Sequence, residues 1–383
     1  MKNPPTTSGG LPELDMKRIL AQTRKELTQI VRDWRTLVLA LVLPLVLLIL
    51  NGSGISLTVT DLPIIVQDFD DSNASRELID AFRASITFHV RQWPADKHPE
   101  EAFKSGDADA ALIIPAHFGR DLARGTNSEI QMLVDASDGN TAKLISGYGL
   151  QITRAFNRKK MSVAHPEPVQ TAIRLWYNPG RSSKKFYGPG IFVLGLSMFP
   201  PLLAALAMSK EGEQKTILQV YVSNISAFEF VLGKILAFMA VAFAEWILGL
   251  ILLFTYFGLS LAGDPTPFIV ATILYAFCVA SFGTMVGANI PNQAAAMQTV
   301  ALFGFLFVFL LSGLIFPVEN IPASLRWLSR FIWGRYYIEI VRDALLQGGG
   351  WPATWYKVLI IGVIGLIFFL LAWRGMRRMQ LKS

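Results

Sequence analysis

The sequence predicts a polytopic α-helical membrane protein with six transmembrane helices and an inserted extracytoplasmic α/β domain. Composition is the first observation: 52% of the 383 residues are hydrophobic and only 16% are charged, which is too apolar for a soluble enzyme of this length. The second is a set of six apolar runs, each long enough to cross a bilayer. The third is a segment of ordinary soluble composition, residues 58–185, between the first two runs.

Charge balance and cysteine content exclude several classes of protein. Lysine and arginine number 35 against 28 aspartates and glutamates, and a membrane protein is expected to carry such an excess on its cytoplasmic side, not on nucleic acid. Cys278 is the single cysteine, so no internal disulfide is expected. No Cys/His cluster has metal-ligand spacing, and no catalytic motif stands out. We therefore expect neither a metal site nor catalytic residues.

The N-terminal region is predicted to lead into the membrane from the cytoplasm. Residues 1–13 are rich in Pro, Gly, Ser and Thr, which is typical of a disordered tip. Residues 14–35 have the spacing of a basic amphipathic helix, which we expect to lie in the membrane interface. A helix that binds another protein is the alternative, but the first transmembrane helix, residues 36–57, follows directly. The basic residues before this span put the N-terminus inside.

The segment 58–185 is predicted to be an α/β domain because strand and helix patterns alternate along it. Strands are expected at 63–67, 88–93, 110–114 and 130–134, and helices at 74–84, 99–105, 117–124 and 141–160. Aspartates follow the strands, for example Asp68, Asp70 and Asp135. They suggest either a cation site or helix and turn caps, and caps are favoured because aspartate prefers such positions.

Residues 186–378 are predicted to hold the other five transmembrane helices. These spans are expected at 186–208, 231–257, 268–288, 299–316 and 355–373. The C-terminal tail that follows is basic, with three arginines and a lysine. An even number of spans places both termini in the cytoplasm, which agrees with this charge.

A polar segment, residues 209–230, separates the second span from the third. Its acidic start and the apolar positions that follow suit a short amphipathic helix at the cytoplasmic membrane surface, able to receive a push from a soluble partner. The candidate contact residues are Glu211, Gly212, Glu213, Gln214 and Thr216. The alternative is that the two acids only stabilise a surface helix through its dipole.

Two other regions carry unusual polar residues. Residues 318–350 should lie outside yet contain several arginines, so we expect two short helices dipping into the outer leaflet with their arginines snorkelling or paired. Glu245 lies near the middle of the third span, where an ionisable group is costly. It either attracts a cationic substrate or is a protonated, hydrogen-bonded structural group, and the sequence does not decide between the two.

Four segments carry a family resemblance. They are 106–125 with Asp109-Ala-Ala-Leu-Ile-Ile-Pro115; Tyr177-Asn-Pro179 with Phe186, Pro189 and Gly190; Glu211-x-Glu-Gln-x-Thr216; and Ser312-Gly-x-x-Phe-Pro317 with Pro322, Arg335, Tyr336, Glu339, Arg342 and Gly348. In these segments the chain resembles the permease subunit of a type-2 ABC exporter, in the multidrug-efflux-like branch with a large extracytoplasmic domain between the first two spans. It departs from the family's coupling segment at Lys215, often glycine, and Asn224, often proline.

The resemblance implies a set of partners. The chain has no Gly-x-x-x-x-Gly-Lys-Ser/Thr loop, so ATP and Mg are expected on separate ABC ATPase subunits. A second permease copy or a paralogue completes the complex in the lipid bilayer of the bacterial inner membrane, and a periplasmic adaptor protein is a further expected partner. Hydrophobic drugs or lipid-like molecules suit an apolar pathway. The rival interpretation is a membrane receptor or sensor that uses the extracytoplasmic domain to bind a ligand.

Overall fold

The chain forms two compact units. A computed structural model describes residues 15–54, 61–126, 128–135, 139–161, 182–214, 225–314, 318 and 321–381. One unit comprises Met1–Ile55 and Leu175–Ser383, and the other comprises Ser56–Arg174. The interruption of the first unit by the second follows the change in composition along the chain.

The second unit is built on a four-stranded sheet with the strand order β2-β1-β3-β4. Its elements are β1 (Leu62–Asp68), α3 (Asn73–Arg83), β2 (Phe88–Gln92), α4 (Pro99–Ser105), β3 (Ala110–Ile114), α5 (Phe118–Ala123), β4 (Gln131–Val134) and α6 (Gly139–Met161). β1 pairs in parallel with β2 and β3, and β4 pairs antiparallel with β3. The predicted alternation of four strands and four helices is confirmed.

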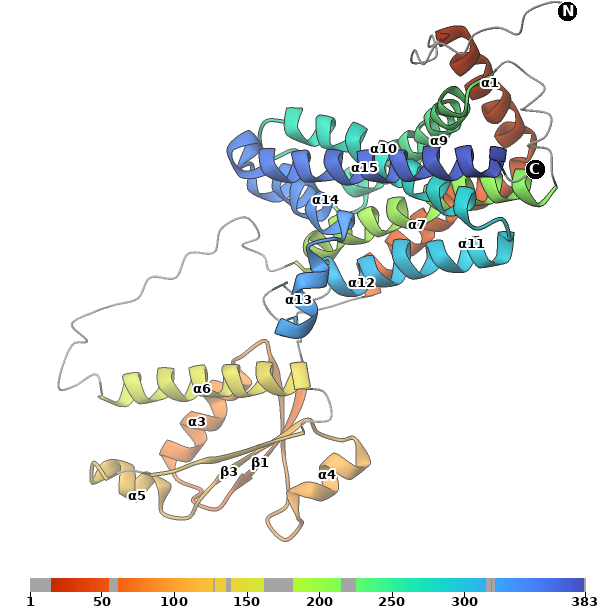
Figure 1. Ribbon diagram of the computed structural model, residues 1–383. Coiled ribbons are helices and arrows are strands. Elements are labelled where there is room, and N and C mark those ends of the chain that lie inside the picture. Colours follow the sequence, from red (N-terminus) through yellow and green to blue (C-terminus); the bar gives the residue numbers. More distant parts are fainter. Residues whose placement is uncertain are drawn as a thin grey trace, which may run out of the picture. The chain divides into compact units, whose positions relative to one another are not determined.

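Helices cover both faces of this sheet (Figure 1). Leu78 and Phe82 of α3 and Phe156 of α6 pack with one face, while Ala102 of α4 packs with the other. The central strand β1 is therefore buried on both sides, and Ile65 is only 1% exposed. A strand with two covered faces reads as a continuous apolar run, which is why its sequence predicted it well.

The aspartates after β1 act as caps. Asp68 accepts hydrogen bonds from the backbone N–H groups of Asp70 and Asp71, at 3.0 and 3.1 Å, and from the Ser75 hydroxyl at 2.6 Å. Ser72 caps α3 in a capping box with Ser75. Within the described residues no group of three or more His, Cys, Asp or Glu side chains could hold a metal ion. The favoured capping interpretation is confirmed for this turn.

The first unit contains six helices that are long and apolar enough to cross a membrane, within the described part of the chain. Its elements are α1 (Met16–Arg32), α2 (Trp34–Gly54), α7 (Ser183–Glu213), α9 (Ala227–Thr255), α10 (Thr266–Asn289), α11 (Gln293–Val300), the π-helical turn η1 (Ala301–Leu306), α12 (Phe307–Leu311), α13 (Ala323–Ser329), α14 (Trp333–Arg342), the π-helical turn η3 (Asp343–Gln347) and α15 (Gly350–Leu381). The chain is thus a polytopic, mostly helical membrane protein.

Helix α7 is the hub of this unit, because it packs against α2, α9, α10, α11 and α14. α10 lies beside both α7 and α15 (Figure 1). A Cβ atom added at Gly283 or Gly287 of α10 would overlap the carbonyl oxygens of Pro201 and Ala205 in α7, so the two backbones touch directly. Small residues allow such close approach between membrane helices.

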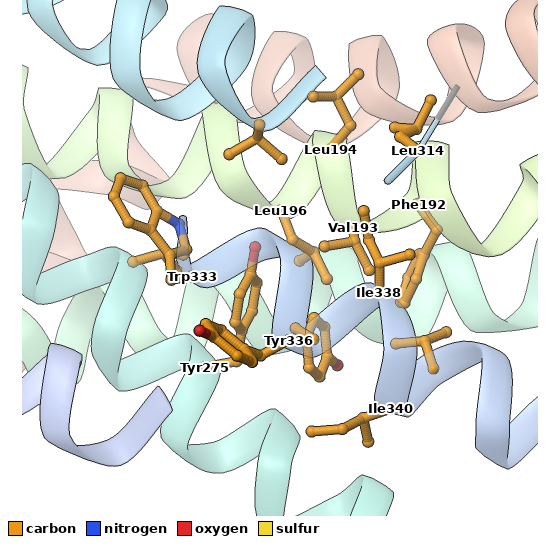
Figure 2. Packing of buried hydrophobic residues seen from close by; sticks show 14 of the residues in the cluster. Phe192, Val193, Leu194, Leu196, Tyr275, Leu314, Trp333, Tyr336, Ile338 and Ile340 are labelled. Carbon is orange, nitrogen blue, oxygen red and sulfur yellow. The ribbon is translucent and has the colours of Figure 1, made fainter. Parts of the chain in front are cut away.

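An aromatic and aliphatic core fills the space between α7, α10 and α14. Figure 2 shows Val193 and Leu196 of α7 facing Tyr275 of α10 and Ile338 of α14. The Tyr275 hydroxyl shares a short hydrogen bond with Ser197 of α7. Buried hydroxyls need such partners, so the polar groups in this core hold neighbouring helices in register.

The fifth span differs from the predicted range 299–316. It begins at Gln293, because the Asn292 side chain accepts a hydrogen bond from the Ala295 N–H at 2.9 Å and caps α11. It ends at Leu311, since Gly313 takes a left-handed conformation with φ 81° that no helix continues through. The span is therefore the same helix placed several residues earlier.

Candidate functional site

The predicted contact residues lie at the end of α7. Glu211, Gly212 and Glu213 form its last turn and Gln214 is its C-cap residue, whereas Thr216 lies outside the described residues. The predicted start of a separate helix at Glu211 is therefore wrong, because α7 continues without a break from the apolar span. The dipole of α7 does not stabilise the two acids. A helix C-terminus carries partial negative charge, which disfavours carboxylates.

Glu211 instead belongs to a charge cluster that we define as Lys25, Glu26, Glu211 and Lys234. The Lys234 ammonium lies 3.0 Å from Glu26 and 3.2 Å from Glu211. Lys25 lies 3.3 Å from Glu211 and 3.7 Å from Glu26. The side chains of Lys234 and Glu26 are only 1% and 2% exposed. The cluster thus joins α1, α7 and α9 through a buried pair, Lys234 and Glu26, with Glu211 largely buried and Lys25 at the surface.

The local sequence explains why these charges meet. Gly233 lets α1 approach α9, since an added Cβ would lie 2.8 Å from Gln22. The Thr23 hydroxyl donates to the Gly233 carbonyl at 3.0 Å, which fixes the contact. Lys234 follows immediately, and its ammonium reaches Glu26 of α1. Gln22 then donates to Glu26 at 2.8 Å and completes the surroundings of that carboxylate.

Further polar contacts tie the same end of the unit together. Glu229 closes a capping box with Ser226 at the start of α9 and also accepts from the Asp15 N–H at 3.0 Å, before α1. Glu213 accepts from the Gln293 side chain at 2.6 Å and so links α7 to α11. Movement of the end of α7 would therefore displace contacts with three other helices, α1, α9 and α11.

The polar residues of 318–350 form a second arrangement, the α13–α14 segment (Ala323–Arg342). Pro322 precedes α13, while Pro317 lies outside the described residues. The other predicted residues, Arg335, Tyr336, Glu339 and Arg342, all lie on α14.

Ion pairs form on the partly buried side of α14. Glu339 lies 3.4 Å from Arg335 and 2.9 Å from Lys357 of α15. The Tyr336 hydroxyl donates to the Arg330 carbonyl at 2.8 Å. These contacts tie α14 to both α13 and α15.

Arg342 is bound by backbone carbonyls instead of carboxylates. Its guanidinium donates to Gly313 at 3.0 Å, Leu314 at 3.3 Å and Phe186 at 3.5 Å. It also lies 4.1 Å from the centre of the Phe186 ring, which is cation–π geometry. Arg342 therefore fixes α14 to the beginning of α7 and to the end of the fifth span.

Glu245 is 3% exposed and lies between α9, α7 and α2. A Cβ atom added at Gly195 would lie 3.0 Å from Glu245 Oε1 and 3.0 Å from Pro44. Within the described residues Glu245 Oε2 has no hydrogen-bond partner. The hydrogen bond between helices that the structural interpretation requires is not made by this atom.

Comparison with known proteins gives a match over most of the chain. The family model of the ABC-2 family transporter protein matches residues 34–374. The chain belongs to the ABC-2 transporter family.

Curated relatives of this ABC-2 family member are similar to it over most of their length. The probable multidrug ABC transporter permease YbhR of Escherichia coli (strain K12) is 26% identical over 361 residues, 91% of this chain and 96% of the relative. YbhS of the same strain, which has the same description, is 25% identical over 373 residues, 96% of this chain and 98% of the relative. The inner membrane transport permease YhhJ of that strain is 25% identical over 317 residues, 81% of this chain and 83% of the relative.

Of the four members of the charge cluster of this ABC-2 chain, sequence reasoning named only Glu211 as a contact residue. Glu26 stands in a helix that is otherwise basic, and Lys234 stands at the start of an apolar span. One signal was available: a lysine inside a membrane helix usually faces a partner. The identity of that partner depends on a contact across more than two hundred residues of chain.

Proposed function

We propose that this chain is the transmembrane subunit of an ABC exporter, forming the export pathway and coupling to a separate ATPase subunit. Membership in the ABC-2 family and the full-length likeness to permeases support this role. YbhR and YbhS are described as probable multidrug permeases, which favours hydrophobic drugs or lipid-like molecules as substrates. The chain itself would then be non-catalytic.

The proposed topology places the α7 end of the unit in the cytoplasm. Basic residues flank the first span at its N-terminal side and follow the last span, which favours cytoplasmic termini. The α/β unit would then be extracytoplasmic, accessible to a periplasmic adaptor protein. The description of YhhJ favours the inner membrane, where a second copy or a paralogue would complete the pathway.

The observation that carries the coupling proposal is the charge cluster at the end of α7. Residues 209–230 are proposed to receive the ATPase, and Glu211 lies at the start of this segment. A push on that segment would move Glu211, and through Lys234 and Glu26 would move α9 and α1. ATP-driven closure of two ATPase subunits would thus bias the permease between two conformations.

The test is affinity purification of the tagged chain in mild detergent, followed by ATP hydrolysis and export assays. We expect a nucleotide-binding subunit to copurify with the wild-type chain. Glu213→Lys reverses an exposed charge in the last turn of α7 and should sharply reduce both hydrolysis and export. Glu101→Gln in the α/β unit changes a carboxylate on a different exposed surface and serves as the control.

The outcomes separate the levels of the proposal. Copurification with activity lost only in Glu213→Lys supports coupling through the α7 end. Retained activity in Glu213→Lys and Glu211→Gln would overturn that coupling site while leaving the exporter role. Failure to recover any ATPase would contradict the exporter role itself.

A further inference from the structure

A cavity of about 860 Å³ lies beside the charge cluster, bounded mainly by α1, α2 and α7. Its apolar wall consists of Ile30, Leu37, Leu203, Leu206, Ala207 and Phe238. Its polar rim includes six charged residues, Lys25, Glu26, Arg32, Asp33, Lys210 and Glu211. One cavity thus combines a hydrocarbon surface with a ring of polar groups, which is the arrangement that an amphiphile requires.

The charged groups at this cavity leave a net excess of one cation when Lys234, which lies outside the lining, is counted with the charge cluster. Lys25 and Lys234 already contact the carboxylates of Glu26 and Glu211. The remaining charged groups of the rim are the cations Arg32 and Lys210 and the anion Asp33. The Thr36 hydroxyl donates to Asp33 at 2.8 Å, so this carboxylate has a partner within its own turn. Arg32 and Lys210 are both exposed and therefore free to approach a ligand.

The cavity lies at the depth where lipid headgroups meet the chain. α1 ends at Arg32, and the candidate membrane span begins two residues later at Trp34. On α7 the basic residue Lys210 is in the last turns of the span, and Leu206 and Leu203 follow one and two turns deeper. The polar rim is thus at the membrane surface, and the apolar wall extends toward the hydrocarbon.

We propose that this cavity binds a phospholipid with an anionic headgroup, taken from the adjacent leaflet. Arg32 and Lys210 hold the headgroup phosphate, and one acyl chain lies against Leu203, Leu206 and Ala207. Basic pockets between membrane helices bind such headgroups through the same pairing. A zwitterionic lipid has a phosphate but no net charge, so it gains less from the two cations. The proposed lipid contacts (Arg32, Lys210, Leu203, Leu206 and Ala207) include none of the candidate coupling residues, so this proposal does not depend on the coupling proposal.

The experiment is native mass spectrometry of the delipidated full chain, titrated with phosphatidylglycerol or with phosphatidylcholine. The wild-type chain should retain phosphatidylglycerol preferentially. Arg32→Gln with Lys210→Gln should weaken phosphatidylglycerol binding about thirtyfold, which is the usual contribution of two basic residues at a membrane surface. Ala207→Phe, which narrows the apolar wall without changing charge, should weaken binding of both lipids.

Lys17→Gln with Arg24→Gln is the matched control, because it removes two exposed charges from the same helix outside the cavity. It should leave the tightly bound phosphatidylglycerol in place. Equal retention of the two lipids by the wild-type chain would overturn the proposal, as would equal losses in the test and control variants. Unchanged lipid binding with a shift from dimer to monomer in the Arg32/Lys210 variant would assign the cavity to a subunit interface instead.

Discussion

The charge cluster and the α13–α14 segment both bury cations, but they satisfy them differently. In the charge cluster the Lys234 ammonium contacts two carboxylates that come from two other helices. In the α13–α14 segment the Arg342 guanidinium donates to three backbone carbonyls at helix ends. The first arrangement joins side chains, whereas the second attaches a side chain to the backbone itself.

Because of this difference, the charge cluster is an adjustable contact between helices, which we call the joint. The Arg342 contacts are a fixed one, which we call the anchor. Carboxylates and ammonium groups on long side chains can exchange partners when helices shift, because each group contacts more than one other. Carbonyls at the ends of helices cannot move without the helices. The comparison teaches that the charged end of α7 is suited to transmit movement, and that the α13–α14 segment is suited to anchor the opposite end of α7.

The largest expected effect comes from breaking the joint. Lys234→Met leaves Glu26 buried without its closest cation, and removal of one partner from a buried pair destabilises by about 3–5 kcal/mol. We expect a clearly lower midpoint of thermal unfolding for the purified chain in detergent. Glu26→Gln combined with Lys234→Met removes both charges and should recover much of the loss. If the double variant is no more stable than Lys234→Met, the ion pair with Glu26 does not account for the stability that Lys234 provides.

A smaller effect is expected from breaking the anchor. Arg342→Met leaves neutral carbonyls behind, so its cost is the loss of hydrogen bonds from a charged group, about 2 kcal/mol. Arg342→Lys keeps the charge but cannot reach three carbonyls at once, and it should recover only part of this stability. The same thermal unfolding measurement ranks the variants. If Arg342→Met lowers the unfolding midpoint more than Lys234→Met does, the expected order of the two contributions is contradicted.

The smallest effect is expected for a carboxylate in water. In the α/β unit the Ser72 side chain and the backbone N–H of Gly119 lower the pKa of Asp70 below its ordinary value of 3.8. A lowered pKa in the folded state stabilises the unit above about pH 4, and this stabilisation is lost as the pH falls through the folded-state pKa. Asp70→Asn should therefore slightly reduce stability at neutral pH and reduce its loss in acid. Circular dichroism of the wild-type chain and the variant between pH 2 and 7 measures this difference. Parallel curves would contradict the prediction.

Sequence patterns predicted the α/β unit well because its signals are local. Four strands and four helices alternate with turn residues between them, and Ser72 and Asp68 make their hydrogen bonds within a few residues of chain. The six spans were equally accessible, because hydrocarbon thickness demands long apolar runs. Their ends were less accurate wherever a cap decided them, as Asn292 does for the fifth span.

The candidate site was only partly predictable. The acidic end of α7 drew attention to Glu211, but its contact with Lys234 depends on how α1 packs against α9. The partners of Arg342 could not be predicted for another reason. They are backbone carbonyls, which every residue has, so no residue type in the sequence indicates them. Long-range pairing of charges and pairing of charges with backbone both require the folded arrangement of the helices.

The direct contact of the α7 and α10 backbones has a kinematic consequence. At Gly283 and Gly287 no side chain separates the two helices, so sliding one along the other would bring a Cβ or a side chain from the next residues against the carbonyls of Pro201 and Ala205. α7 and α10 are therefore expected to tilt together at this contact instead of sliding past each other. A small tilt of α7 at Glu213 would then also change the direction of the helix near Phe186. Arg342 holds α7 in place at that end, so the helix would pivot there.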